Sequence, residues 1–326
     1  MHPTRRDFIV RTGQALVLAG GTTALGLGIH NRDNGVRGAE TTTRVKSFLP
    51  KDDPALPQMC IAKGEDPASL VRAAIDGLGG IKRFISRGDI VAIKPNIGWA
   101  RVPAQGANTN PEMVSEMVRL CFDAGAKRVI VSDVSLNDPQ RCFDLSGIRV
   151  AAAKMGADVF LPQDRHFRER QLGGEMLKLW PVYMALTEAD KIINMPVMKH
   201  HNLCTATGGM KNWYGLLGGM RNQLHQNINL SIADLATFMR PTLTVMDAYR
   251  VLFRNGPQGG SFRDVMLKKQ VIATIDQVAG DAYGVELLGR KVEELPYLPM
   301  AHARNIGTMH WRTLRHKMIE VPSTPG

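Results

Sequence analysis

Cysteine is scarce in this chain of 326 residues, and its few copies are widely spaced. The cysteines are Cys60, Cys121, Cys142 and Cys204, and no two of them form a C-x-x-C pair. Zinc ribbons, ferredoxin-type clusters and thioredoxin-like sites all need closely spaced cysteine ligands. We therefore do not expect the chain to hold an iron–sulfur cluster of its own. Cys121 falls on an apolar helical face, where we expect a small buried side chain.

The common catalytic and nucleotide-binding motifs are also missing. The sequence contains no HExxH pair, no GxSxG elbow, no GxxxxGK[ST] loop and no GxGxxG after its first predicted strand. These absences count against a zinc protease, a serine hydrolase, a P-loop enzyme and an ordinary dinucleotide-dependent dehydrogenase.

Basic residues are abundant but dispersed. The net charge is +11 and the pI is about 9.7, yet no dense basic run with interleaved aromatic residues occurs. Such a distribution favours a small anionic ligand or an anionic envelope surface over nucleic acid. The length suits one large domain or two modest ones, and the 44% hydrophobic content is enough for a substantial core.

The N-terminus has the pattern of an export signal. Thr4-Arg5-Arg6-Asp7-Phe8-Ile9 resembles the twin-arginine motif, and an uncharged, glycine-rich apolar stretch follows from Thr12 to Ile29. That stretch is too short and too rich in glycine for a convincing membrane helix. We expect residues 1–40 to be a signal peptide and the protein to be periplasmic. A chance arginine pair before an uncleaved membrane anchor is the alternative.

The rest of the chain alternates between strand and helix patterns. We expect a linker and an N-terminal helix at 41–87, an α/β domain at 88–290 and a C-terminal tail at 291–326, whose basic run 310–317 is solvated. The predicted strands are 90–93, 128–133, 158–161, one within 189–197, 242–247 and 271–276; the predicted helices are 67–80, 110–124, 149–155, 229–239 and 278–288. This alternation predicts a mostly parallel sheet flanked by helices.

Polar residues follow several of the predicted strands. Lys94, Asn96, Asp133, Asp247 and Asp276 each stand at the carboxyl end of one. Ligands of parallel α/β sheets bind outside those ends, which predicts a shared site. The alternative is that each aspartate forms a turn or caps a helix.

The segment 195–219, MPVMKHHNLCTATGGMKNWYGLLGG, concentrates the polar chemistry. His200 and His201 are adjacent, and in extended backbone they point to opposite sides, so one metal cannot use both. Gly208 and Gly209 offer free backbone amides, and Lys211 adds an ammonium group. Together they would cradle a carboxylate or phosphate. A tight turn beside a solvated lysine is the alternative.

The ordered set of motifs resembles one known family. It comprises Ile93-Lys94-Pro95-Asn96, Thr109-Asn110-Pro111-Glu112, Lys199-x-His201, Thr207-Gly208-Gly209-Met210-Lys211-Asn212, His225, Leu243-Thr244-Val245-Met246-Asp247 and Asp276-x-x-Ala279-x-Asp281. This is similar to the domain of unknown function 362 family, over about residues 88–290. The resemblance implies no defined activity. It favours His201 over His200, and it favours a functional Lys211-Asn212. Many members carry a ferredoxin module, which this chain lacks.

We therefore expect an exported enzyme or redox-associated protein that acts on a small anionic, carboxylate-type ligand. The expected catalytic residues are His201, His225 and Lys211. The expected substrate-binding residues are Lys94, Asn96, Lys199, Asn212, Gly208 and Gly209. Aspartates would orient a histidine or bind a divalent metal, namely Asp247, Asp276 and Asp281.

Two other functions remain open from the sequence. A non-catalytic periplasmic protein that binds an anion or a cofactor would need the same basic residues. An accessory subunit of a redox complex is also consistent, because the twin-arginine route carries folded proteins, sometimes together with a partner. We expect no membrane-spanning segment beyond the signal.

Overall fold

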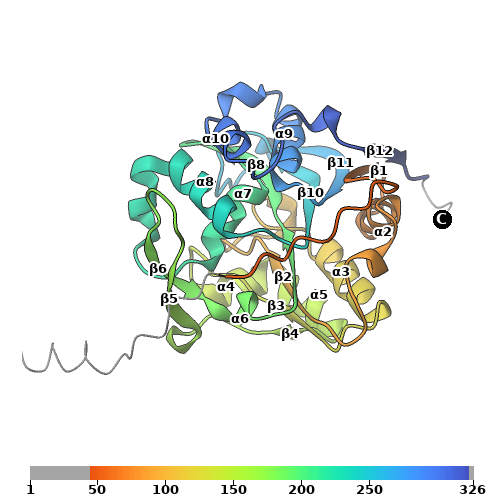
Figure 1. Ribbon diagram of the computed structural model, residues 1–326, viewed down its shortest axis with the longest axis horizontal. Coiled ribbons are helices and arrows are strands. Elements are labelled where there is room, and N and C mark those ends of the chain that lie inside the picture. The colour runs from red at the N-terminus through yellow and green to blue at the C-terminus, as the bar shows by residue number, and fades with distance from the viewer. Residues whose placement is uncertain (1–44, 323–326) are drawn as a thin grey trace, which may run out of the picture. The chain divides into compact units, whose positions relative to one another are not determined.

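A computed structural model describes residues 45–322, so the predicted export signal lies outside the described residues. The described chain is organised around a ten-stranded mixed sheet (Figure 1). The strands of its main path occur in the order β12-β1-β11-β10-β7-β2-β3-β4, and β8 and β9 extend from β10. Within residues 45–322 no helix is long and apolar enough to cross a membrane.

The bounds of the regular elements are as follows. The strands are β1 (Met59–Lys63), β2 (Ile90–Pro95), β3 (Arg128–Val131), β4 (Asp158–Val159), β5 (Phe167–Gln171), β6 (Leu179–Tyr183), β7 (Lys191–Met195), β8 (Val197–His201), β9 (Thr205–Thr207), β10 (Leu243–Leu252), β11 (Val265–Thr274) and β12 (His316–Glu320). The helices are α2 (Pro67–Gly77), α3 (Pro111–Asp123), α4 (Pro139–Leu145), α5 (Ile148–Lys154), α6 (Met184–Thr187), α7 (Gly209–Asn212), α8 (Ile228–Phe238), α9 (Gln277–Leu287) and α10 (Tyr297–Ala303).

The predicted fold class, a mostly parallel sheet flanked by helices, is confirmed. The neighbours β10·β7, β7·β2, β2·β3 and β3·β4 are all parallel. Strand β11 departs from this pattern because it runs antiparallel to both β10 and β1. The carboxyl end of β11 therefore lies at the edge of the sheet opposite to the carboxyl ends of the parallel strands.

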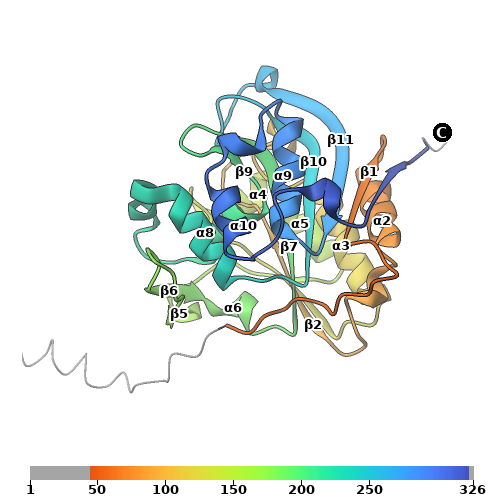
Figure 2. The same cartoon turned by 45° about the horizontal axis from the view of Figure 1, so that its top comes forward.

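Alternating side chains build a core on each face of the sheet. In β2, Val91 and Ile93 belong to the cluster under α2, α3 and α5, whereas Ala92 belongs to the cluster under α8, α9 and α10. Figures 1 and 2 show these two groups of helices on opposite sides of the strands. A strand buried on both faces reads as a continuous apolar run, which is the pattern of residues 90–93.

Local signals explain where α3 begins. The Asn110 side chain caps it by accepting the backbone N–H of Glu112 at 3.0 Å, and Pro111 occupies its first turn. Proline suits this position because its missing N–H would have no partner within the helix. The loop that leads from β2 into α3 is thereby fixed at the carboxyl edge of the sheet.

The segment after β7 differs from the prediction. Pro196 interrupts the strand, but the chain resumes directly as β8, so Lys199, His200 and His201 lie in a strand and not in a loop. Strand β10 pairs first with β7 and then with β8, where Leu252 is opposite Lys199. Tertiary pairing thus extends β10 beyond the predicted end at Asp247.

The C-terminal residues also belong to the folded body. Strand β12 pairs in parallel with β1, with Met59 opposite His316. Helix α10 packs against α8 and α9. Trp311 is buried against Tyr283, their ring centroids 5.0 Å apart. The expectation of a solvated basic run is therefore wrong for Trp311, since this aromatic ring completes the core beside α9.

Candidate functional site

A cavity of about 300 Å³ lies at the carboxyl edge of the sheet. Five stretches of chain form its wall: the loop after β2, the loop after β3, the end of β8 with its following turn, the segment from the end of β9 through the turn Arg221–Asn227, and the loop after β10 at Pro257. The predicted site residues that line it are Lys94, Asn96, Lys199, His201, Lys211, Asn212 and His225. The fold thus brings together side chains that lie up to 131 residues apart in sequence, from Lys94 to His225.

Lys94 is fully buried and completely partnered. Its ammonium Nζ lies 2.7 Å from Oδ1 of Asp133 and 3.1 Å from both the Pro95 carbonyl and Asn212 Oδ1. Burial lowers the pKa of Lys94, while Asp133 acts to raise it. All three N–H groups of the ammonium are used, so Lys94 holds the site together and has no donor left for a ligand.

Asn96 and Asn212 serve the same network. The Asn212 carbonyl oxygen accepts from Lys94 and from the Asn96 amide at 2.9 Å, and its amide donates to Asn194 at 2.8 Å. The Asn96 oxygen accepts from Lys199 at 3.0 Å. These amides orient lysines, which differs from the predicted role of donating to a substrate.

Lys199 is buried but retains one free position. Its ammonium donates to Asn96 Oδ1 at 3.0 Å and to the Ala107 carbonyl at 2.5 Å. Burial, and secondarily the charge of Lys211, lowers the pKa of Lys199 to about 7. Its environment therefore favours the neutral amine more than water does, and the protein fixes two of the three bonding positions of its ammonium.

Lys211 is the cation without an anionic partner. Within residues 45–322 its ammonium makes neither a hydrogen bond nor an ion pair, and it lies 4.6 Å from the centroid of the Tyr214 ring. Burial lowers its pKa. An aromatic face stabilises an ammonium weakly and leaves its hydrogen-bonding capacity unused.

Three further lining groups were not among the predicted site residues. Arg221 donates to the carbonyls of Val134 and Ser135 at 2.8 and 2.7 Å, and no carboxylate pairs with it in the described part of the chain. The hydroxyls of Thr207 and Tyr214 are buried without a hydrogen-bond partner. Thr207 opens the family motif Thr207–Asn212 but was not singled out as a site residue, and Tyr214 lies outside the family motifs, so their place on the cavity identifies them.

The two predicted histidines meet at the cavity. The rings of His201 and His225 are nearly parallel, with centroids 6.4 Å apart. His201 Nδ1 accepts the Leu203 N–H at 3.1 Å, while His200 is not part of the lining. Burial and the neighbouring lysines lower the pKa of His201 to about 2, and burial also lowers that of His225. Both burial and the neighbouring lysines therefore favour the neutral imidazole of His201.

The glycine loop does not face the cavity as an anion cradle. The N–H groups of Gly209 and Met210 donate to the carboxylate of Asp281, at 2.5 and 3.1 Å. A Cβ on Gly208 would lie 2.3 Å from Asp281 Oδ1. Gly208 and Gly209 therefore have an internal role in the structure: the Gly209 amide is bonded to the buried carboxylate of Asp281, and Gly208 packs directly against it.

The three aspartates that were predicted to bind a metal each have a different structural role. Asp247 accepts the N–H groups of Asn110 and Tyr249, and Asp276 caps α9 at the opposite edge of the sheet, where antiparallel β11 ends. Asp281 is bound by the glycine loop, and burial raises its pKa to about 7. The described residues contain no group of three or more His, Cys, Asp or Glu arranged to hold a metal.

Residues 91–286 match the family described as Domain of unknown function (DUF362), which is more than half of the chain. The chain belongs to this family. The cavity lies within the matched region, since its lining extends from Lys94 to Pro257. The predicted family resemblance is therefore confirmed, whereas the export signal falls outside the match.

The chain is also similar to several known proteins. The "Thylakoid-associated protein sll1697" of Synechocystis sp. is 22% identical over 274 residues, which cover 74% of this chain and 81% of that protein. Among solved structures, the lactate racemase apoprotein from Thermoanaerobacterium thermosaccharolyticum has a TM-score of 0.41 at 13% identity over 78% of this chain. A protein from Thermotoga maritima has a TM-score of 0.39 at 9% identity over 73% of this chain. The chain covers 63% and 60% of these two structures.

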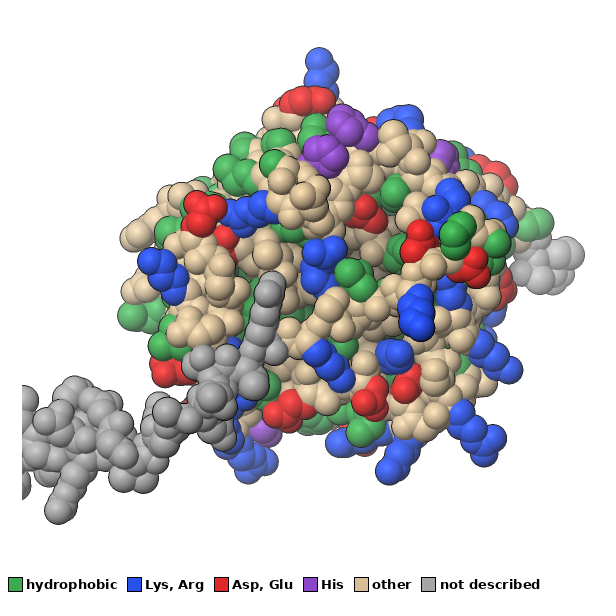
Figure 3. Space-filling view, viewed as in Figure 1, with side chains coloured by type: hydrophobic (Ala, Val, Ile, Leu, Met, Phe, Trp, Pro, Cys, Tyr) green, Lys and Arg blue, Asp and Glu red, His purple; other side chains and the backbone are tan. Residues whose placement is uncertain are grey.

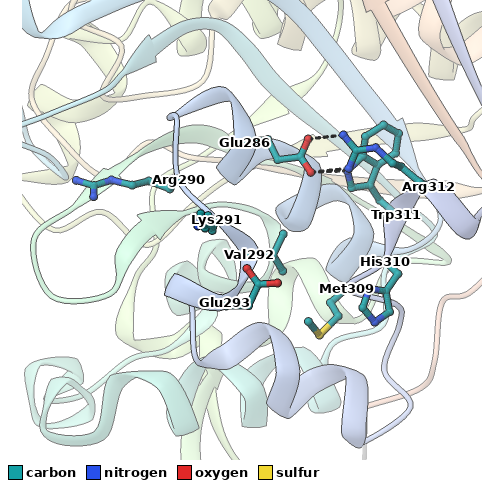
Figure 4. Close-up of a pocket in the computed structure, with 9 residues that line it drawn as sticks. All are labelled: Glu286, Arg290, Lys291, Val292, Glu293, Met309, His310, Trp311 and Arg312. Atoms are coloured by element: carbon teal, nitrogen blue, oxygen red, sulfur yellow. Dashed lines mark hydrogen bonds and ion pairs between the residues drawn. The ribbon is translucent and has the colours of Figure 1, made fainter.

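A second cavity of this DUF362 member, which we call the Trp311 groove, has a volume of about 380 Å³ and lies between the end of α9 and the segments 290–293 and 309–312. Figure 4 shows the Glu286 carboxylate facing Arg312 and Trp311, which lie side by side. Its carboxylate accepts two bonds from Arg312, at 2.8 and 2.9 Å, and one from the Trp311 indole at 3.0 Å. Arg290 is 3.3 Å from Glu294. Both arginines of the groove are therefore paired with a carboxylate.

On the face drawn in Figure 3, Lys and Arg side chains are interspersed with Asp and Glu and do not form one continuous basic patch. This agrees with the dispersed charge of the sequence.

Proposed function

We propose that the protein binds a small carboxylate-bearing anion in the cavity at the carboxyl edge of its sheet. The observation that carries this proposal is the free ammonium of Lys211, which has no anionic partner within residues 45–322. Lys211 is half-buried. Withdrawing an ammonium from water without a counter-charge is costly, so this arrangement favours an anion that completes it.

The charge of the whole lining supports the same ligand class. Four cationic side chains face the cavity, namely Lys94, Lys199, Lys211 and Arg221. Asp133 is the single carboxylate in this lining, and Lys94 already neutralises it. The cavity therefore has a net positive charge before any ligand enters.

The available donors define where the anion binds. Lys211 offers its ammonium, Lys199 offers the position not used by Asn96 and Ala107, and Thr207 and Tyr214 offer unpartnered hydroxyls. Charge-assisted hydrogen bonds of this kind are the strong ones in proteins. The volume of about 300 Å³ limits the ligand to a small molecule.

Binding is tested by calorimetric titration of the purified protein with acetate, succinate and inorganic phosphate. We expect carboxylate binding, weakened about 10- to 100-fold by Lys211→Met, because a charge-assisted bond is worth roughly 1.5–3 kcal/mol. Lys82→Met is the matched control, since Lys82 is exposed and precedes the amino end of β2. Equal affinities in wild type and Lys211→Met would remove the proposed site.

A proton-transfer reaction is the second candidate, and the hydrogen bonding of Lys199 favours it. With two positions fixed by Asn96 and Ala107, a neutral Lys199 amine has its lone pair available to accept a proton from a bound carbon acid. Loss of the methyl proton signal of pyruvate in D₂O, followed by NMR, measures this exchange. We expect exchange in the wild type above the buffer rate and none in Lys199→Met.

We further propose that the twin-arginine motif directs export to the periplasm. Its support is the order of Arg5-Arg6, two apolar residues and an uncharged stretch in the sequence. The test is cell fractionation of the full chain beside an Arg5→Lys/Arg6→Lys variant. We expect the wild type in the periplasmic fraction and the variant in the cytoplasm. Cytoplasmic wild type would refute the proposal.

A further inference from the structure

We infer that the ligand is amphiphilic, with a single anionic head among the lysines and an apolar body that extends to the mouth of the cavity. This inference rests on the proposed function and narrows its ligand class to monocarboxylates with an aliphatic or aromatic chain. It follows from the contrast between the floor and the mouth of the same cavity.

Exposure separates the floor from the mouth. Lys199 and His201 are 1% and 3% exposed, so they form the floor, whereas Leu136 and Leu203 are 56% and 57% exposed. Leu136 and Leu203 nevertheless line the cavity, as do the part-buried Trp99 and Pro257. Charge is therefore concentrated at the bottom and apolar surface at the entrance.

The apolar side chains of the mouth come from four separate loops that contact the floor or one another. The Leu136 N–H donates to the Gly98 carbonyl at 3.0 Å, which places it beside the loop that carries Trp99. The Leu203 N–H donates to His201 Nδ1 at 3.1 Å. Scattered exposed leucines are ordinary, but convergence of four loops on one cavity is a specific arrangement.

The Pro257 loop closes the remaining side. The N–H of Gly256 donates to the ring of His200 at 3.2 Å, and a Cβ on Gly256 would lie 2.0 Å from the His200 carbonyl oxygen. Only glycine allows this approach, which sets Pro257 against the end of β8. The mouth is thus held by backbone contacts and its apolar surface is already formed without a ligand.

The exposed side chains of the mouth carry no charge. Asn202 and Asn222 are the exposed polar side chains of the lining, and both are uncharged. Lys94 and Lys199 lie on the floor, and the part-buried Arg221 is directed to the carbonyls of Val134, Tyr214 and Ser135. A ligand with a carboxylate at each end would leave one of them against Leu136 and Leu203, where its desolvation has no compensation.

The test is a calorimetric series of acetate, butyrate, hexanoate and octanoate, with succinate as the charged counterpart of butyrate. We expect affinity to rise about two- to fourfold per methylene, as burial of a CH₂ group against the mouth requires. Butyrate should bind more tightly than succinate. In the double variant Leu136→Ser/Leu203→Ser, the gain in affinity per methylene should become smaller, while the affinity for acetate, which is too short to reach the mouth, stays unchanged.

The control is Leu267→Ser, because Leu267 is also 57% exposed but lies on β11 and does not line the cavity. If acetate and succinate bind to the wild type but affinity does not rise with chain length, this inference is overturned and the proposed anion site is retained. An unchanged gain in affinity per methylene in the double variant would also overturn the inference, as would tighter binding of succinate than of butyrate. If no carboxylate binds, the proposed function fails as well.

Discussion

The cationic cavity and the Trp311 groove are both lined by several charged side chains, but their charges are compensated differently. In the groove, the carboxylate of Glu286 receives Arg312 and Trp311, and Arg290 pairs with Glu294 at the surface. In the cavity, the described lining contains one carboxylate and four cations, and two of the lysines are almost fully buried.

The difference shows why the number of charges does not by itself identify a site. Exposed pairs are solvated by water and need no further partner, whereas a buried ammonium without an anion is unfavourable until one arrives. The same distinction holds inside the cavity, where Lys94 is fully paired and Lys211 is not. The predictions below test this contrast, from the largest expected effect to the smallest.

Lys94→Met should destabilise the protein by about 3–5 kcal/mol, because it leaves the carboxylate of Asp133 buried without its cation. Urea denaturation measures the change. Lys94→Met/Asp133→Asn should recover part of the loss, since the uncompensated charge is removed. Lys211→Met should not lower the free energy of unfolding and should raise it slightly, because no ion pair is lost and an uncompensated ammonium is removed. Equal losses for Lys94→Met and Lys211→Met would contradict the assignment of one paired and one unpaired lysine.

Gly208→Ala should cost roughly 1–3 kcal/mol, as overpacked sites do. The new Cβ would lie 2.3 Å from Asp281 Oδ1, so the turn that carries Lys211 must shift. We therefore expect a lower melting temperature and also weaker carboxylate binding. An unchanged melting temperature would show that the glycine loop and Asp281 are less closely packed than described.

Raising the pH should weaken carboxylate binding, because burial lowers the pKa of Lys199 to about 7. A carboxylate stays ionised from about pH 6 to 9, so the loss of affinity reports deprotonation of the cavity, by up to about tenfold per pH unit. Lys199→Met should make carboxylate affinity less dependent on pH. The remaining dependence should come from Lys211, whose pKa is also lowered. Affinity that is constant across this range would exclude the lysines as charge partners.

The contribution of Lys199 to the stability of the ligand-free protein should increase with pH, whereas carboxylate binding weakens with pH. An unfolded lysine has a pKa of about 10.4, so between about pH 7 and 10 the unfolded chain binds more protons than the folded one. The contribution of Lys199 to the free energy of unfolding therefore increases with pH over this window. The free energies of unfolding of the wild type and of Lys199→Met, measured by urea denaturation at about pH 7 and pH 10, give this contribution.

Arg312→Met should have the smallest effect, a loss of no more than about 1 kcal/mol, because its pair with Glu286 is solvent-exposed on the arginine side. Carboxylate affinity should be unaffected, since Arg312 belongs to the groove. Weaker binding in this variant would mean that the groove and the cavity act together, and the comparison between them would fail.

Much of the sheet could be predicted from short-range patterns. The apolar run 90–93 and the Asn110-Pro111 cap of α3 depend on neighbours in sequence, and both appear as expected. Lys94 was identified because it stands at the carboxyl end of a predicted strand, and Lys199 and Lys211 because they belong to the polar segment 195–219 and to the family motifs. Local periodicity and capping therefore locate the edge of the sheet at which the cavity forms.

Residues whose environment depends on distant segments could not be assigned in this way. Asp276 follows a strand as expected, but that strand is antiparallel and delivers it to the opposite edge. The amides of the glycine loop looked free because their partner, Asp281, lies more than 70 residues further along the chain. Arg221 showed no local signal, and its contacts to the loop after β3 give it its place.

The sequence by itself determined the α/β class, the family and the set of basic residues near one edge of the sheet, because periodicity, capping and motif order are local properties. The tertiary structure alone decided which of those residues face a ligand. Strand direction, burial and pairing arise when distant segments meet. They leave Lys94 neutralised by Asp133 and Lys211 without an anion.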